Sequence, residues 1–207
     1  NMALAVQQVT EQVVLKMAAT ARELTDCPNL VMAGGVSLNC VANGKLLRTG
    51  IFDDIWIQPA AGDAGGALGA ALAARYIWQG KERIVAAPPK ADAMQGSYLG
   101  PSFSEQDSVR TARKYDAPFT RYNDFQELSR EVSERIDNGQ AVGWFQGRME
   151  WGPRALGNRS ILGDARSRQM QTVMNLKIKF RESFRPFAPI VLRDRVSEFF
   201  QMRDQED

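Results

Sequence analysis

Two short apolar segments are each followed at once by glycines and then by a helical pattern. The first, residues 30–33, runs into Gly34 and Gly35 ahead of an amphipathic stretch. The second, residues 54–58, alternates like a strand and leads through a Pro-Ala-Ala-Gly turn into a helix rich in Ala and Gly. Such junctions bring backbone N–H groups and a helix N-terminus to one point, which suits phosphate. The sequence predicts an α/β (α+β) fold, and plain structural glycine turns remain an equal alternative to phosphate sites.

Periodicity predicts the other elements. Residues 2–24 form an amphipathic pattern that places Val9 and Val13 on an apolar face. Ser104 and Asp107 resemble an N-cap and its acidic third helical position. The remaining predictions are helices over 68–78, 105–114 and 125–138, and strands over 119–122, 140–145 and 184–192.

Composition excludes several classes of site. The chain has no histidine, which rules out His-dependent triads and most self-contained zinc or iron sites. Its two cysteines, Cys27 and Cys40, are too few for a disulfide framework or a thiolate cluster, and a reducing cytoplasm is expected. The net charge of +2 gives no global field that would recruit nucleic acid or an anionic membrane. No apolar run approaches the roughly twenty residues of a membrane helix.

Residues 147–160, here called the arginine loop, concentrate positive charge around a single carboxylate, Glu150. Guanidinium groups match phosphate and carboxylate oxygens in a bidentate way, so the cluster predicts an anion site. Taken singly, each arginine is equally well explained by a salt bridge. Asn158 and Ser160 add neutral groups suited to a small amide or a sugar. The arginines of the loop are Arg148, Arg154 and Arg159.

A second group of cations occupies residues 179–185, here called the basic segment. It comprises Lys179, Arg181 and Arg185. Because Pro186 and Pro189 stiffen the chain beyond it, we expect the start of a rigid strand that clamps an anion against the arginine loop. Upstream, Asp63 begins a glycine-rich helix, where it can cap the helix, bind a metal or contact a ribose.

Four stretches together resemble the NodU/CmcH-type O-carbamoyltransferases. They are residues 34–39, 59–66, 147–160 and 184–189. The resemblance implies two modules, an actin-like ATPase-fold module with an iron site and a nucleotide cleft, followed by a YrdC-like module. It assigns residues 1–85 to the C-terminal portion of the first module, 86–97 to a linker, and 98–207 to an incomplete YrdC-like module.

The resemblance also implies the chemistry. ATP with Mg²⁺ and carbamoyl phosphate would give carbamoyl-adenylate, and the carbamoyl group would pass to a hydroxyl of a small molecule or sugar. By motif position, Asp63 would ligate Fe²⁺. The implied nucleotide contacts are Gly34, Gly35, Asn39, Gly62 and Ser160. The implied catalytic residues are Arg148, Arg154, Asn158, Arg159, Lys179, Arg181 and Arg185.

The family's histidine metal ligands have no counterpart here. We therefore expect an internal fragment that is inactive by itself, with the remaining iron ligands upstream. A homodimer is left open. Two alternatives to carbamoyl transfer also stay open: a YrdC-like threonylcarbamoyl-adenylate or tRNA-modifying protein, and a non-catalytic module that binds a nucleotide or a phosphometabolite.

Overall fold

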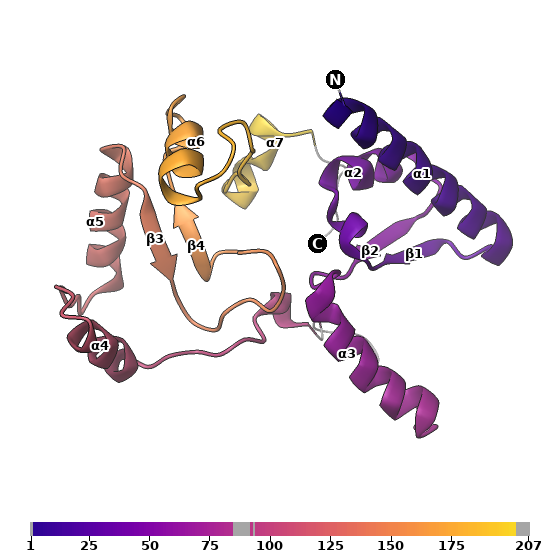
Figure 1. Ribbon diagram of the computed structural model, residues 1–207, viewed down its shortest axis with the longest axis horizontal. Helices are drawn as coiled ribbons and strands as arrows, with labels where there is room; N and C mark the ends of the chain where they lie inside the picture. The colour runs from indigo at the N-terminus through magenta and orange to yellow at the C-terminus, as the bar shows by residue number, and fades with distance from the viewer. Residues whose placement is uncertain (1, 85–91, 93, 202–207) are drawn as a thin grey trace. The chain divides into compact units, whose positions relative to one another are not determined.

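A computed structural model describes residues 2–84, 92 and 94–201 (Figure 1). The chain divides into two compact units, each built from separate stretches of sequence. Unit 1 comprises Asn1–Val109 and Phe145–Arg159, and unit 2 comprises Arg110–Trp144 and Ser160–Asp207. Residues 86–91 and 93 of the predicted linker lie outside the described residues. The assignment of actin-like and YrdC-like modules stays a prediction.

Unit 1 is organised on a parallel pair of strands, each followed by a helix. Leu30 pairs with Ile55 and Met32 with Ile57. Alternate residues face the helices, so Leu30 and Ile55 pack against the core formed by Ala18, Leu46 and Phe52, while Val31 points outward. In Figure 1, α1 and α2 lie beside each other on this pair. The elements are α1 (Met2–Thr25), β1 (Asn29–Met32), α2 (Cys40–Thr49), β2 (Asp54–Ile57) and α3 (Asp63–Ala73), which continues as a π-helical turn (Ala74–Trp78).

The predicted inward face of α1 is only partly correct, since Val14 of that face packs against the core. Val9 and Val13 are exposed, whereas Glu11 is buried to 6% exposure. Burial of this carboxylate is tolerated because Lys45 of α2 forms an ion pair with it and Gln7 donates a 2.8 Å hydrogen bond to it. The hydrogen bond from Lys45 and, next in size, the one from Gln7 lower the pKa of Glu11.

Unit 2 combines short helices with a strand pair. Asp124 caps α5 by accepting a 2.9 Å hydrogen bond from the Gln126 N–H. Figure 1 shows β3 and β4 side by side with opposite directions, and their end residues Phe145 and Arg159 belong to unit 1. The elements are α5 (Phe125–Asp137), β3 (Val142–Phe145), β4 (Arg159–Leu162), α6 (Met170–Val173), a π-helical turn (Met174–Ile178) and α7 (Val196–Phe199), while α4 (Glu105–Lys114) begins in unit 1.

Three sequence predictions differ from these elements. The stretch 119–122 is not a strand, because a strand needs a ladder partner and the described sheets contain only the pairs β1–β2 and β3–β4. The stretch 184–192 is not a strand either, since its two prolines lack N–H donors. Conversely, Arg159 and Ser160, expected in the arginine loop, are the first two residues of the strand β4. The Ser104–Asp107 capping box is confirmed by reciprocal bonds of 3.0 and 3.2 Å.

Among the described helices, none combines the length and the apolar character that crossing a bilayer requires.

Candidate functional site

Two glycine turns follow the carboxyl ends of β1 and β2 and are tied to each other. The Gly34 N–H donates a 2.8 Å hydrogen bond to the Ala61 carbonyl. Gly34 has φ +103°, a conformation that favours glycine. No described atom lies within 4 Å of a Cβ built at Gly34, Gly35 or Gly62. The Gly34 N–H is thus already used, while the space beside each of these glycines is clear of other described residues, at the strand edge where parallel sheets bind ligands.

The side chain of Asn39 is already engaged. It caps α2 by accepting a 3.2 Å hydrogen bond from the Ala42 N–H. Its amide also pairs with Gln7 of α1, to which it donates at 2.9 Å. Asn39 thus ties α1 to the start of α2, and its contact with a nucleotide stays a prediction.

Asp63 is the first residue of α3 and is exposed. The N-cap position belongs to Gly62, and no side chain caps the helix, so the capping alternative for Asp63 is not realised. In the described part of the chain, no group of three or more His, Cys, Asp or Glu residues is placed to hold a metal ion. The residues present here do not fit a complete iron site, and Asp63 as a ligand stays a prediction.

The arginine loop is fixed to residues 97–101 by a series of hydrogen bonds within unit 1. The Arg148 guanidinium donates to the carbonyls of Gly100 at 2.9 Å and Leu99 at 3.0 Å. The Trp151 N–H donates to the Ser97 carbonyl at 2.6 Å. Arg148 therefore holds the backbone of residues 99–100, and fewer of its guanidinium N–H groups remain for a ligand.

Gly152 brings the arginine loop against the second glycine turn. A Cβ at this position would lie 3.2 Å from the Pro59 carbonyl oxygen and 3.4 Å from the Ala60 Cα. Its φ of +128° is also one that side chains rarely allow. The loop and the turn, distant in sequence, are thus neighbours in one unit because this position has no side chain.

Glu150 lies at the centre of the loop, with a side chain that is 0% exposed. Its carboxylate accepts hydrogen bonds from the N–H groups of Leu156 at 2.6 Å and Asn158 at 2.8 Å. Its second oxygen lies 3.2 Å from Nε of Arg159. Desolvation raises the pKa of Glu150, but the hydrogen bonds from Asn158 and Leu156 outweigh it, so the pKa lies below the usual value.

The other polar residues of the loop have structural partners as well. Asn158 donates a 2.7 Å hydrogen bond to the Arg148 carbonyl. Arg159 donates to the carbonyls of Gly152 at 2.6 Å and Arg154 at 3.3 Å. Ser160 lies half-buried in β4 rather than in a loop. Within the described residues, the exposed Arg154 guanidinium makes no hydrogen bond or ion pair.

The basic segment, in unit 2, is organised by a residue that sequence reasoning missed. Asn175, in the π-helical turn after α6, is 0% exposed. Its amide donates to the carbonyls of Ser183 at 3.0 Å and Arg185 at 2.8 Å, and its oxygen accepts from Arg181 Nε at 2.7 Å. The sequence did contain a signal for this role. Asn175 is a single amide between Met174 and Leu176, and a polar residue in an apolar stretch that is buried needs hydrogen-bond partners.

The three cations of the basic segment differ in their surroundings. Arg181 is held by Asn175 and lies over the Phe187 ring, 4.9 Å from its centroid. Arg185 is paired with Glu182 through a 2.8 Å hydrogen bond. Lys179 is exposed, and its ammonium makes no hydrogen bond or ion pair with the described residues. Lys179 is thus the cation of this segment that a ligand can reach without breaking a contact.

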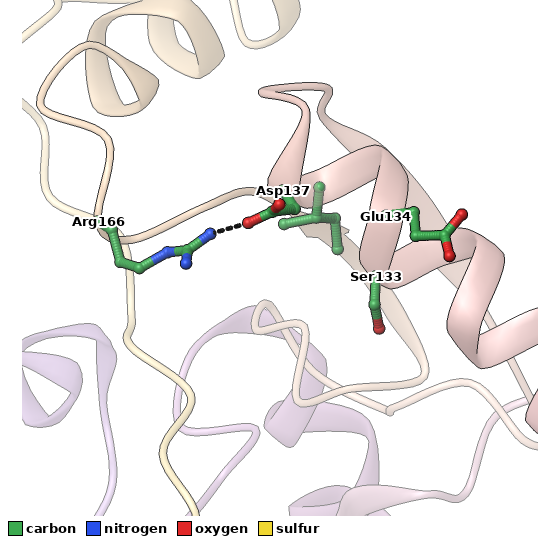
Figure 2. A pocket seen from close by; sticks show the side chains of 5 residues that line it. Ser133, Glu134, Asp137 and Arg166 are labelled. Atoms are coloured by element: carbon green, nitrogen blue, oxygen red, sulfur yellow. Dashed lines mark hydrogen bonds and ion pairs between the residues drawn. The ribbon is translucent and has the colours of Figure 1, made fainter.

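A separate open depression of about 480 Å³ lies between α5 and the segment after β4. Figure 2 shows Arg166 reaching toward Asp137, with which it forms an ion pair. Arg166 also contacts Asp164 at 2.9 Å, and these two carboxylates raise its pKa. None of the predicted site residues lines this depression. Its arginine, Arg166, is paired with Asp137 and Asp164, so among the described lining residues the depression offers no unpaired guanidinium to a ligand. Its lining residues are Ser133, Glu134, Ile136, Asp137 and Arg166.

The lowered pKa of Glu150 predicts a pH dependence of the loop. A group with a depressed folded-state pKa stabilises the fold above its unfolded value, about 4.3 for glutamate, and this contribution is lost as pH falls through the folded value. We expect the amide NMR shifts of Leu156 and Asn158 to titrate with a midpoint below that value. The step should be absent in Glu150→Gln, and a midpoint at or above the unfolded value would contradict the assignment.

These features define an α+β protein with glycine turns at a parallel strand edge and an arginine loop held beside one of them. The carbamoyltransferase N-terminus family matches residues 1–72, and the carbamoyltransferase C-terminus family matches residues 133–207. The chain belongs to the NodU/CmcH-type carbamoyltransferase family, which confirms the resemblance inferred from the motifs.

Three relatives illustrate the match. The chain is 54% identical over 98% of its length to the uncharacterized protein sll1178 of Synechocystis, and spans 32% of that protein. It is 38% identical over 96% of its length to nodulation protein NolO of Bradyrhizobium diazoefficiens, of which it spans 35%. It is 40% identical over 99% of its length to nodulation protein NolNO of Sinorhizobium fredii, of which it spans 29%. The chain thus spans about a third of these relatives.

Proposed function

We propose that this chain supplies the donor-activating part of an ATP-dependent O-carbamoyltransferase. The donor is carbamoyl phosphate, the nucleotide is ATP with Mg²⁺, and the acceptor is a hydroxyl of a small molecule or sugar. In balanced form, carbamoyl phosphate, ATP and water give carbamoyl-adenylate, pyrophosphate and phosphate. The acceptor oxygen then attacks the carbamoyl carbon and AMP leaves. A cytoplasmic location and a homodimer stay predictions.

The observation that carries this proposal is the exposed Arg154 guanidinium. Its neighbours Arg148 and Arg159 donate to backbone carbonyls, whereas the Arg154 guanidinium makes no hydrogen bond or ion pair with the described residues. An unpaired guanidinium has no contact to break when an anion arrives, and it offers two parallel hydrogen bonds to phosphate. Arg154 is therefore the donor through which the loop would bind carbamoyl phosphate or a nucleotide phosphate.

The nucleotide part of the proposal is supported by the two glycine turns. The space around a Cβ built at Gly34, Gly35 or Gly62 is clear of other described residues, and α3 begins directly after Gly62. The N–H groups of a first helical turn have no intrahelical partner and attract phosphate. Because Gly152 packs on the Pro59–Ala60 backbone, the arginine loop adjoins this edge. Clustered donors of both kinds offset the repulsion between two phosphorylated substrates.

We expect Arg154→Ala to reduce carbamoyl-phosphate-dependent pyrophosphate release about ten- to hundredfold, the effect of removing one charged donor. Arg154→Lys should recover part of the loss, since it keeps the charge without the fork. Arg135→Ala is the matched control, because this arginine forms an exposed 2.6 Å ion pair with Glu131 on α5.

The assay is made on the intact protein with ATP, Mg²⁺ and carbamoyl phosphate. Unchanged release in Arg154→Ala would remove Arg154 from the reaction. Binding of both substrates without any pyrophosphate release would favour a non-catalytic module. Release that needs threonine in addition would favour the threonylcarbamoyl-adenylate alternative.

A further inference from the structure

A single buried carboxylate connects the two sides of the arginine loop around Arg154. Oε1 of Glu150 accepts the N–H groups of Leu156 and Asn158, on the C-terminal side of Arg154. Oε2 lies 3.2 Å from Nε of Arg159, an ionic contact because neither atom has a hydrogen-bond partner. One side chain therefore fixes two backbone positions and one guanidinium.

Arg159 extends this connection back to Arg154 itself. Its Nη2 donates to the carbonyl of Gly152 at 2.6 Å and to the carbonyl of Arg154 at 3.3 Å. The backbone before Arg154 and at Arg154 is thus held by Arg159, and the backbone after it is held by Glu150. The side chain of Arg154 has no described contact of its own, so this backbone sets the point and the Cα–Cβ direction from which the guanidinium extends.

We propose that Glu150 is the positioning residue that directs Arg154 toward its anion, an inference that rests on the proposed function of the loop. The carboxylate acts through Arg154 and does not touch the anion, since its side chain is 0% exposed. It also balances the charge of Arg159. Because Arg148 donates to the carbonyls of Gly100 and Leu99, Arg154 is the guanidinium of the loop that an anion can approach without breaking a hydrogen bond.

A glutamine cannot take the place of this carboxylate. If its oxygen kept the Leu156 and Asn158 N–H groups, its NH₂ group would face Nε of Arg159, and two donors would oppose each other. If it turned around, both backbone N–H groups would lose their acceptor. Glu150→Gln therefore loosens one side of Arg154 in either orientation while it preserves side-chain volume.

A double-mutant cycle separates positioning from a general structural role. Affinity for inorganic phosphate and for carbamoyl phosphate is measured by calorimetry on wild type, Glu150→Gln, Arg154→Ala and the double variant. We expect Glu150→Gln to weaken binding about tenfold or more in the presence of Arg154 and to have no further effect in Arg154→Ala. Glu131→Gln, which removes the carboxylate of an exposed ion pair on α5, should bind as wild type.

Each outcome decides the inference. Additive losses in the double variant, or unchanged affinity in Glu150→Gln, would overturn it, because Glu150 would then not act through Arg154. Absence of any phosphate or carbamoyl phosphate binding to wild type would overturn it too. A non-additive cycle combined with no pyrophosphate release would keep the inference and reject the proposed carbamoyl transfer.

Discussion

Gly65→Ala is expected to destabilise unit 1 by more than about 3 kcal/mol. A Cβ at this position would lie 2.1 Å from the Ala60 carbonyl oxygen, far inside van der Waals contact. The obstructing atom is backbone, and Ala60 is 0% exposed, so it cannot move aside as a flexible side chain would. The first turn of α3 would have to separate from the glycine turn that precedes it.

Gly66→Ala is the matched control because it changes the adjacent residue of the same helix. No described atom lies within 4 Å of a Cβ at Gly66, and alanine favours helix over glycine by about 0.5–1 kcal/mol. Urea denaturation followed by circular dichroism should therefore move the two variants in opposite directions. Equal midpoints would show that the Gly65–Ala60 approach does not constrain the fold.

Gly65→Ala should also affect the arginine loop. Ala60 is the residue on which Gly152 packs, with 3.4 Å between a Cβ at Gly152 and the Ala60 Cα. A displacement of Ala60 would thus reach the backbone two residues before Arg154. Weaker phosphate binding in Gly65→Ala than in Gly66→Ala is the expected consequence.

Features set by near neighbours in sequence could be predicted. The Ser104–Asp107 capping box needs only residues three apart, and its reciprocal bonds are present. The strand β1 could be predicted from a short apolar run that ends at two glycines, and β2 from alternation, which matches a pair with one face packed on helices. The predicted mixture of helices and small sheets is confirmed at this level.

Features set by distant partners could not be predicted. Glu11 is buried beside Ala18 and pairs with Lys45 of another helix, so the packed face of α1 includes a carboxylate that the apolar pattern places on the polar side. The strand β4 depends on pairing with β3, while its own first residues, Arg159 and Ser160, look like loop. Periodicity carries no information on either partner.

The sequence predicts that the arginines of the loop form one cluster, but it does not predict that they have different roles. Sequence reasoning gave Arg148, Arg154 and Arg159 the same role, because their charges are the same. Contacts divide them, since two guanidinium groups hold carbonyls and that of Arg154 makes no hydrogen bond or ion pair with the described residues. Glu150 was visible as a lone carboxylate, yet its N–H partners at Leu156 and Asn158 follow from the loop's conformation and not from spacing.

Asn175→Leu is expected to cost about 3 kcal/mol and to release the basic segment. Leucine has a similar volume, so the packing is nearly kept, but the Ser183 carbonyl and the Nε–H of Arg181 lose their bonds to Asn175. Among the described residues, the Arg185 carbonyl keeps only the 3.2 Å hydrogen bond from Gln171. Each buried group left unpaired costs about 1–3 kcal/mol. Asn175→Asp should fall between, because it still accepts from Arg181 but no longer donates to the two carbonyls.

Trypsin reports directly on this release, since it cleaves after lysine and arginine. Local opening exposes the bonds after Lys179 and Arg181, so cleavage there should accelerate in Asn175→Leu while distant sites in the same unit are cut at the wild-type rate. Asn123→Leu is the control, because Asn123 is exposed and lies before α5. If Asn175→Leu matched this control in both stability and cleavage, Asn175 would not be the residue that holds the basic segment. If cleavage instead rose throughout unit 2, Asn175 would support the whole unit, and the position of Arg181 would be a secondary effect.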